Sequence, residues 1–304
     1  MIFREKRTGW RVWALVVLLV AGCGKQEESY QPVFSTRGVG DPEEYVIGIH
    51  PLHNPKRLIE VYGPVVDRLN AAIPQAHFRL EASRNYEEFE KKLFGRRFDF
   101  AMPNSYETVR SLKHGYHVFA KMGDDDLFRG IILVRRDSGI RQVSDLKGKK
   151  VSYPALTALA ATMMPQYYLH THGLDVNRDI VNVYVGSQES SIMNVLRGHV
   201  AAGATWTVPW NIFQKEQPRQ AAQLEVKWRT DTLPNNGWVV RNDVQPILAE
   251  KVSKVLVGLS ATPEGKAMLK KIGVSRFEYA TSQTYKPVEQ YLKVFSETVR
   301  HVEY

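Results

Sequence analysis

The chain of 304 residues contains one cysteine, and its surroundings define the covalent chemistry that this thiol can support. Cys23 follows a basic leader, an apolar run from Val12 to Val20 and the small pair Ala21-Gly22. A basic start, a short apolar core and small residues at the cleavage point are typical of a bacterial secretory signal. The apolar run is shorter than the roughly 20 residues that a permanent membrane span needs. The sequence therefore predicts export, with residues 1–22 acting as a signal peptide.

The tetrad Val20-Ala21-Gly22-Cys23 is similar to the lipobox, the processing site at which the cysteine of a bacterial lipoprotein becomes the acylated first residue. We therefore expect Cys23 to carry a lipid that anchors the protein to a bacterial membrane, in the periplasm or on the cell surface. The alternative is a transmembrane anchor in which the cysteine is incidental. Lys25 to Gly40 is polar and poor in apolar side chains, so residues 23–44 are predicted to form a flexible tether.

Other residue types that could do chemistry lack the neighbours that the chemistry needs. His50 and His53 are close enough in the sequence to suggest a metal site, but no further histidine, cysteine or carboxylate cluster completes one. The sequence has no Gly-x-Ser-x-Gly elbow, no phosphate-binding P-loop and no Glu-x-x-His metal pair. A single cysteine also excludes a disulfide within the chain. We therefore expect neither an enzyme nor a bound metal or cofactor.

The formal net charge of +9 is compatible with an anionic solute or a nucleic acid as partner. The predicted signal peptide has four basic residues and one acidic residue, which contribute +3 and leave +6 for the remainder. The basic residues are scattered, with one tight cluster at Lys147, Lys149 and Lys150. No nucleic-acid-binding motif accompanies them, so we interpret most of this charge as a solvated basic face and do not expect nucleic acid as a partner.

Segments typical of strands and helices alternate from Tyr45 onward, judged from apolar periodicity, from the expected helix cap Asn85 and from the expected helix stop Gly173. Strands are expected at 45–49, 78–81, 98–102, 129–135, 144–151 (a turn and a strand), 181–185, 201–206 and 237–240. Helices are expected at 55–72, 86–93, 105–114, 158–172, 189–196, 246–259, 262–271 and 285–302. This alternation favours parallel sheets with helices on their faces. The pattern restarts after 129–135, which indicates a second α/β unit inserted into the first.

Three stretches sharpen this interpretation: residues 99–106 (DFAMPNSY), residues 143–152 (VSDLKGKKVS) and residues 186–204, which begin with GSQESS and end with GHVAAGA. Together they resemble the phosphate/phosphite/phosphonate-binding family of ABC importer subunits. The resemblance implies a two-lobed periplasmic binding protein of type II. Each lobe would be a mixed, mainly parallel sheet flanked by helices, and two hinge crossovers, expected near residues 128–134 and 235–240, would join the lobes. We expect residues 45–130 and 236–304 in the first lobe and residues 131–235 in the second.

The resemblance also implies which residues face the ligand. The family has a Ser-Thr-Ser-Gly run at the start of the second-lobe helix, where hydroxyl and backbone N–H groups hold a phosphonate. Here the corresponding stretch begins with Thr157-Ala158 and lacks most of those hydroxyl groups. The family's histidine is replaced by Gln188, Trp206 stands where an aspartate is expected, and the tyrosine that closes the first-lobe motif is kept. The expected ligand-binding residues are His50, Asn104, Ser105, Tyr106, Thr157, Ala158, Gln188 and Trp206.

These replacements change the expected ligand. Each missing hydroxyl or charge would have bonded a buried anion, and its loss costs about 1–3 kcal/mol. We therefore expect weak binding of compact phosphonates and a flatter or more apolar ligand, because Trp206 and Trp210 enlarge the apolar share of the cleft. Backbone N–H groups near Thr157 could still hold one oxyanion. Packing is the alternative role for Tyr106 and for one of the tryptophans, and a solvated loop is the alternative for Gln188.

In functional terms, the resemblance implies a lipid-tethered receptor that captures a small-molecule solute, with anions among the candidates, and passes it to an ABC permease in the membrane. The first alternative is a sensory binding protein that presents its closed form to a membrane histidine kinase or chemoreceptor. The second is a binding fold that has lost its ligand and serves as an interaction module. The ligand itself is not identified by the sequence.

Overall fold

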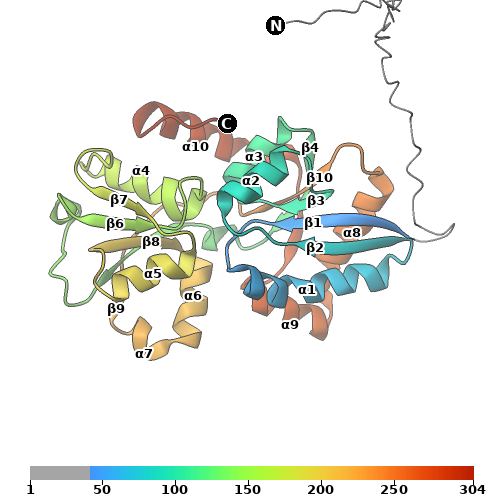
Figure 1. Cartoon of the computed structure of the whole chain (residues 1–304), viewed down its shortest axis with the longest axis horizontal. Helices are drawn as coiled ribbons and strands as arrows, with labels where there is room; N and C mark the ends of the chain where they lie inside the picture. Colours follow the sequence, from blue (N-terminus) through green and yellow to red (C-terminus); the bar gives the residue numbers. More distant parts are fainter. Residues whose placement is uncertain (1–41) are drawn as a thin grey trace, which may run out of the picture. The chain divides into compact units, whose positions relative to one another are not determined.

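The computed structural model describes residues 42–304, so the predicted signal peptide, Cys23 and nearly all of the predicted tether lie outside the described residues. Within this range the chain forms two sheets, each flanked by helices (Figure 1). None of the helices between residues 42 and 304 is both long enough and apolar enough to cross a membrane.

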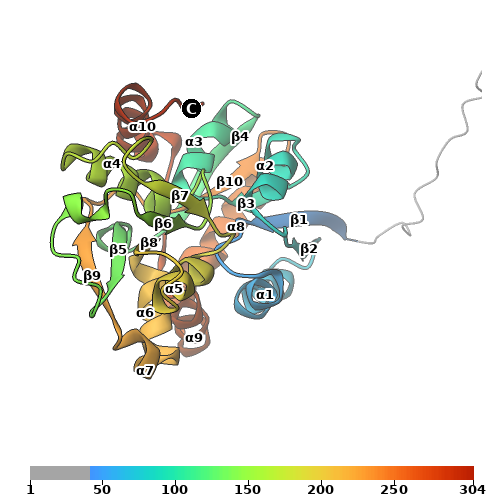
Figure 2. The same cartoon turned by 60° about the vertical axis from the view of Figure 1, so that its left-hand side comes forward.

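The larger sheet has six strands, and with the helices packed on it forms the first lobe of residues 42–304. From edge to edge the strands are β11 (Phe277–Tyr279), β4 (Tyr116–Met122), β10 (Gly237–Arg241), β3 (Phe100–Met102), β1 (Glu43–Ile49) and β2 (Ala76–Glu81). The helices are α1 (Pro55–Ala72), α2 (Tyr86–Phe94), α3 (Ser105–Leu112), α8 (Pro246–Gly258) and α9 (Pro263–Ile272). In both views α2 and α3 lie on one side of β1 and β3, and α1 lies on the other (Figure 1, Figure 2).

The smaller sheet has five strands in the described range and forms the second lobe. Its order is β7 (Val181–Tyr184), β6 (Lys150–Tyr153), β8 (Ala202–Trp206), β5 (Gly130–Arg135) and β9 (Leu224–Arg229). Its helices are a π-helical turn (Leu159–Met163) that continues into α4 (Met164–Thr171), and then α5 (Gln188–Leu196), α6 (Thr207–Glu216) and α7 (Pro218–Ala221).

Both sheets are mixed, as the sequence predicts, but parallel pairs are not in the majority. In the first lobe β1 is parallel to β2 and β3, whereas β10 is antiparallel to β3 and β4, and β11 is antiparallel to β4. In the second lobe β6 is parallel to β7 and β8, whereas β5 is antiparallel to β8 and β9. The chain enters the second lobe through β5 and returns to the first lobe through β10. Each of these strands runs antiparallel to a neighbour from the parallel part of its sheet, β5 to β8 and β10 to β3.

Local sequence explains where several elements begin and end. Asn85, predicted as a helix cap, accepts a hydrogen bond from the Glu88 N–H at 2.9 Å and starts α2. Gly173, predicted as a helix stop, has a φ of 83°, a left-handed conformation that glycine adopts without strain. The predicted helix at 285–302 is shorter, because α10 ends at Thr298. The sequence prediction misses β4, β9, β11, α6 and α7.

Two crossovers join the lobes: residues 123–129 lead from β4 to β5, and residues 230–236 lead from β9 back to β10. They are hydrogen bonded to each other along their length, from Met122 N–H to Asn236 O at 2.9 Å, from Leu233 N–H to Phe128 O at 3.2 Å and from Thr230 N–H to Gly130 O at 3.0 Å. The predicted hinge segments 128–134 and 235–240 overlap the ends of these crossovers but extend into β5 and β10. The lobe boundaries themselves stay a prediction.

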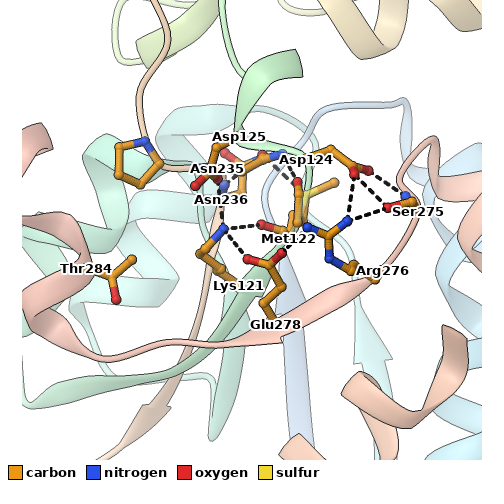
Figure 3. A network of polar contacts seen from close by, with 12 residues as sticks. Lys121, Met122, Asp124, Asp125, Asn235, Asn236, Ser275, Arg276, Glu278 and Thr284 are labelled. Carbon is orange, nitrogen blue, oxygen red and sulfur yellow. Dashed lines mark hydrogen bonds and ion pairs between the residues drawn. The ribbon is translucent and has the colours of Figure 1, made fainter.

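A polar network anchors the crossovers to the first lobe (Figure 3). Asn235, which is fully buried, donates from Nδ2 to Gly123 O at 2.8 Å and from its backbone N–H to Asp125 Oδ1 at 2.9 Å. The Lys121 ammonium lies 2.8 Å from carboxylate oxygens of both Asp125 and Glu278. The two crossovers are therefore tied to one another and to β4 and β11.

The last helix, α10 (Lys286–Thr298), and the residues after it contact both lobes, and residues 286–304 are called the C-terminal strap below. On the second lobe, Arg300 donates to Leu156 O at 2.6 Å, and Asn177 Nδ2 donates to Val299 O at 2.7 Å. On the first lobe, the Glu303 carboxylate pairs with Arg110 at 2.7 Å. In Figure 1 α10 lies beside α4 and α3, one from each lobe.

Candidate binding site between the lobes

The start of the second-lobe helix after β6 presents backbone donors at the lobe interface. The helical turn begins after Ala158, and no side chain of the described residues caps it. The first N–H groups of a helix have no acceptor within the helix, and the helix dipole adds positive potential at the same point. Ala158, Leu159 and Ala160 are all buried, with exposed fractions of 3, 0 and 4%. A buried, uncapped helix start of this kind suits an oxyanion.

Thr157, one residue before that start, is held by two side chains of the first lobe. Its hydroxyl donates to Glu90 Oε1 on α2 in a short hydrogen bond. Its carbonyl accepts from Asn104 Nδ2 at 3.3 Å, from the residue that precedes α3. The loop before the second-lobe helix is therefore enclosed between α2 and the start of α3.

A capping box fixes the start of α3, where three of the predicted site residues lie. The Asn104 side chain accepts from the N–H groups of Tyr106 at 2.9 Å and Glu107 at 3.3 Å, and Glu107 Oε2 accepts from the Asn104 N–H at 2.9 Å. This reciprocal pair satisfies donors that a helix start otherwise leaves unpaired. Ser105 Oγ donates to Pro234 O at 2.8 Å, which ties the same helix start to the second crossover.

Two carboxyl groups face each other at this interface. Glu107 is fully buried, and the Glu90 side chain is 16% exposed. Burial raises the pKa of Glu90, and burial together with the nearby Glu90 charge raises the pKa of Glu107 well above its usual range. Glu107 Oε1 has no hydrogen-bond donor among residues 42–304.

Gln188 completes the interface from the first turn of α5, in which Ser187 is the cap. Its Oε1 accepts from the Thr205 hydroxyl at 2.9 Å, and its Nε2 lies 3.5 Å from the Tyr86 hydroxyl on α2 of the first lobe. Gln188 is 3% exposed, so it is a buried interlobe contact and not part of a solvated loop.

The other three predicted residues lie at different depths. His50 Nδ1 is 2.9 Å from Met102 O, and its ring packs edge-on against Tyr86, so it lies behind that tyrosine. Burial lowers the pKa of His50 to about 4, which keeps its ring neutral. Tyr106 lies under the Arg110 guanidinium, 5.7 Å from it, and burial raises its pKa to about 12. Trp206 packs against Phe128 of the first crossover with ring centroids 5.5 Å apart.

The structure thus places Asn104 and Thr157 in contact with each other across the interface, with Ser105, Tyr106 and Ala158 as their neighbours in the chain, and it places Gln188 in contact with Tyr86 of the other lobe. His50 and Trp206 reach this group through Tyr86 and the crossover. Whether these eight residues bind a ligand stays a prediction. The sequence reasoning missed Tyr86, Glu90 and Glu107, although the Asn-x-x-Glu spacing of a capping box was a readable signal for Glu107.

The lobes are closed on one another. Besides the contacts of Thr157, Arg57 of α1 forms a bidentate pair with Glu216 of α6 at 2.6 and 3.0 Å. The cavity beside Gln188 at this interface measures about 40 Å³ and is lined by residues that include His53, Arg57 and Glu189. That space holds a few water molecules but no drug-sized solute. A drug-sized solute therefore fits in this cavity only if the lobes separate.

Among residues 42–304 no group of three or more histidine, cysteine, aspartate or glutamate side chains is arranged to hold a metal ion. The interface offers groups for hydrogen bonding and charge: backbone N–H donors at a helix start, the hydroxyl and amide side chains described above, and two carboxyl groups.

Solved structures share the two-lobed fold. A binding protein component of an ABC phosphonate transporter from Pseudomonas aeruginosa superimposes with a TM-score of 0.78 at 17% identity, over 85% of this chain and 88% of that one. PhnD1 from Prochlorococcus marinus, solved in complex with methylphosphonate, gives 0.77 at 19% identity, over 84% and 99%. The predicted fold class, a two-lobed protein with mixed sheets flanked by helices, is confirmed.

Curated relatives are similar over part of their length. The probable ABC transporter phosphite binding protein PhnD1 of Prochlorococcus marinus is 24% identical over 186 residues, which is 57% of this chain and 63% of the relative. The phosphonates-binding periplasmic protein of Escherichia coli is 21% identical over 171 residues, which is 55% of this chain and 50% of the relative. Both relatives are named as binding proteins.

A family model described as "ABC transporter, phosphonate, periplasmic substrate-binding protein" matches residues 47–285, which include both sheets and the interlobe residues above. The family predicted from the three sequence stretches is confirmed: the chain belongs to the family of phosphonate-type periplasmic substrate-binding proteins of ABC transporters.

Proposed function

We propose that this protein is the solute-binding subunit of an ABC importer and that its solute carries an oxyanion of the phosphonate type, bound between the lobes. The observation that carries the proposal is the buried, uncapped helix start at Ala158, which faces α2 and α3 of the other lobe. The related fold of PhnD1, solved with methylphosphonate, supports an oxyanion as the class of ligand.

The two-lobed architecture supports capture and release. Two crossovers join the lobes, and the cavity beside Gln188 is too small for a drug-sized solute, so we propose that binding involves opening and closing about the crossovers. A permease in the membrane that distinguishes the liganded form is the partner we propose. The alternative from sequence, a sensory protein that works with a histidine kinase or chemoreceptor, finds no support in the names of the relatives above.

Compact phosphonates are expected to bind weakly. The stretch at the helix start retains two hydroxyl groups, and both are engaged within the protein. The Thr157 hydroxyl bonds Glu90, and the Thr162 hydroxyl bonds Ala155 O at 2.6 Å. An oxyanion therefore depends on backbone N–H groups unless it displaces Glu90 from Thr157.

We also propose a lipid anchor on Cys23, export of the chain to the periplasm or cell surface, and the lobe boundaries 45–130 with 236–304 and 131–235. The basic leader, apolar run and lipobox-like tetrad support the anchor. The membership of the strands in the two sheets supports the lobe boundaries. No catalytic activity is proposed, since the relatives are named as binding proteins.

Titration calorimetry and thermal unfolding of the full chain in detergent test the ligand class, with methylphosphonate, phosphite and phosphate as probes. At least one probe is expected to raise the melting temperature, because a ligand at a hundredfold excess over its dissociation constant stabilises by about 2.7 kcal/mol. Thr157→Val should weaken binding, whereas Thr171→Val, at the exposed end of α4, should not. The absence of any response to all three probes would contradict the proposal.

A further inference from the structure

The Glu90 carboxyl group lies beside the helix start at which the proposed function places a ligand oxyanion, with the Thr157 hydroxyl as its hydrogen-bond donor. It crosses the lobe interface from α2 and accepts a hydrogen bond from the Thr157 hydroxyl, one residue before the buried helix start. A carboxylate at a helix start is stabilised by the same N–H groups and dipole that stabilise a bound anion. The Glu90 carboxylate of the first lobe therefore presents to the second lobe an oxyanion that is part of the protein.

We propose that Glu90 is a specificity-determining residue that competes with solute oxyanions for Thr157 and the helix start, so that a compact oxyanion binds only by displacing it. The inference rests on the proposed function and deepens it. It explains how the ligand-free lobes can close, because the Glu90–Thr157 contact bridges them. It also explains why a second negative charge is disfavoured at this point.

The second carboxyl group strengthens the competition. Glu107 is fully buried, its Oε2 is used in the capping box, and its Oε1 has no donor within residues 42–304. Burial and the nearby Glu90 charge raise the pKa of Glu107 well above its usual range, so protonation of Glu107 leaves the pair with one negative charge, beside Thr157. A phosphonate dianion that entered beside this charge would be repelled, whereas full protonation of the pair would remove the repulsion.

The other charged and titratable groups around the pair come from three elements, α2, α3 and the C-terminal strap. Arg110 of α3 is the cation on this side, with Nη1 3.8 Å from Glu90 Oε2, but it also pairs with Glu303 of the C-terminal strap. The remaining titratable neighbours are Tyr86, Glu87 and Tyr106. Arg110 is thus shared between two carboxylates, and its charge does not cancel that of the pair. Binding of an oxyanion is therefore expected to take up a proton at the carboxyl pair.

The test compares the full chain with its Glu90→Gln and Glu87→Gln variants by titration calorimetry. Glu90→Gln keeps an oxygen that can accept from Thr157 but removes the charge. Glu87→Gln removes one charge from an exposed position on the same helix and serves as the matched control. Methylphosphonate is one probe, and methanesulfonate is the other because it does not titrate in the working range and so reports only the protein's protons.

We expect Glu90→Gln to tighten binding of both probes by roughly tenfold, as removal of one competing charged hydrogen bond implies. Glu87→Gln should leave the affinity within roughly twofold. In the unchanged protein, methanesulfonate should bind more weakly as the pH rises and with net proton uptake, because the pKa values of both carboxyl groups are raised by burial, and Glu90→Gln should reduce both effects. Weaker binding in Glu90→Gln would overturn the inference, because it would mean that the carboxylate contacts a cationic part of the ligand.

The proposed function and this inference fail in different ways. If the unchanged protein binds the probes and Glu90→Gln binds them equally well with the same pH dependence, the inference is wrong and the proposed function stands. If neither protein binds any probe, both are wrong. A ligand-free measurement adds a second test: Glu90→Ala should increase the interlobe distance seen by electron–electron double resonance, whereas Glu87→Gln should not, and equal distances would contradict the bridging role.

Discussion

The Asn235 side chain joins the second crossover to the first, although no sequence motif marks this residue. Replacing it by alanine tests the hydrogen-bond network of the crossovers. Its side chain donates to Gly123 O at 2.8 Å and accepts from the Asn236 N–H at 2.8 Å. Gly123 and Asn236 are themselves buried, and Asn235 is fully buried. Asn235→Ala therefore leaves one carbonyl and one N–H group without their partners and without access to solvent (Figure 3).

The expected cost follows from those two orphaned groups. Each buried polar group that loses its partner costs about 1–3 kcal/mol, so the free energy of unfolding should fall by about 2–4 kcal/mol after allowance for local relaxation. Two hydrogen bonds of the backbone at position 235 remain in the variant: its N–H donates to Asp125, and its carbonyl accepts from the Tyr285 hydroxyl. Because these bonds still hold the crossover, the loss is expected toward the lower part of the sum of the two costs. Asn242→Ala is the control, because Asn242 is exposed and bonds an exposed histidine at its surface.

Urea unfolding followed by circular dichroism measures both variants. The midpoint should shift for Asn235→Ala with an unchanged slope, which indicates a loss of stability without a change in the surface exposed on unfolding. Asn242→Ala should stay within about 0.5 kcal/mol of the unchanged protein. An equally small loss for Asn235→Ala would show that the crossovers are not held together by this side chain, and the reasoning from buried partners would be refuted.

Three further predictions concern other parts of the chain. Cys23→Ser should abolish lipid attachment, and an unchanged mature mass with unchanged membrane partition would contradict the predicted anchor. Burial lowers the pKa of His50 from its ordinary value of 6.5 to about 4, so its neutral form stabilises the fold fully above pH 6.5 and that contribution is lost as the pH falls toward 4. At the lower pH the loss is on the order of 3 kcal/mol, and denaturant titrations of His50→Gln should show a shallower decline over this interval than the unchanged protein. Trp206 is 3% exposed and packs against Phe128, so Trp206→Ala should lower the free energy of unfolding by about 3–5 kcal/mol. A decrease below about 1 kcal/mol, measured by thermal unfolding, would place the Trp206 ring outside the core.

The fold was largely predictable because most elements carry their own local signals. The helix expected at 55–72 matches α1 in full, where Asn54 caps the start and Pro55 occupies the first turn. The missed strands have weaker signals for identifiable reasons. β11 has three residues, too few for a periodic pattern, and β9 alternates charged with apolar residues along a sheet edge. The antiparallel course of β10 depends on a partner more than a hundred residues earlier, which periodicity does not reveal.

The candidate site was predictable only in part, because its contacts join distant segments. The sequence stretches that carry the family resemblance contain Asn104, Ser105, Tyr106 and Gln188, and the structure brings these residues to one interface. Glu90 is 67 residues from Thr157 in the chain and lies in a helix whose other glutamates face solvent or pair with lysine. Nothing local distinguishes it from them, so its role emerges only from the arrangement of the two lobes.

The C-terminal strap has a practical consequence for any measurement of affinity. The C-terminal strap is hydrogen bonded to the second lobe through Arg300 and Val299 and forms an ion pair with the first lobe through Glu303. A closed ligand-free form that outweighs the open one by a hundred to one raises the observed dissociation constant roughly a hundredfold above the intrinsic value. A purification tag or fluorescent reporter fused after Tyr304 would perturb these contacts of the C-terminal strap. Proteins labelled at opposite ends of the chain should therefore report different affinities for the same solute.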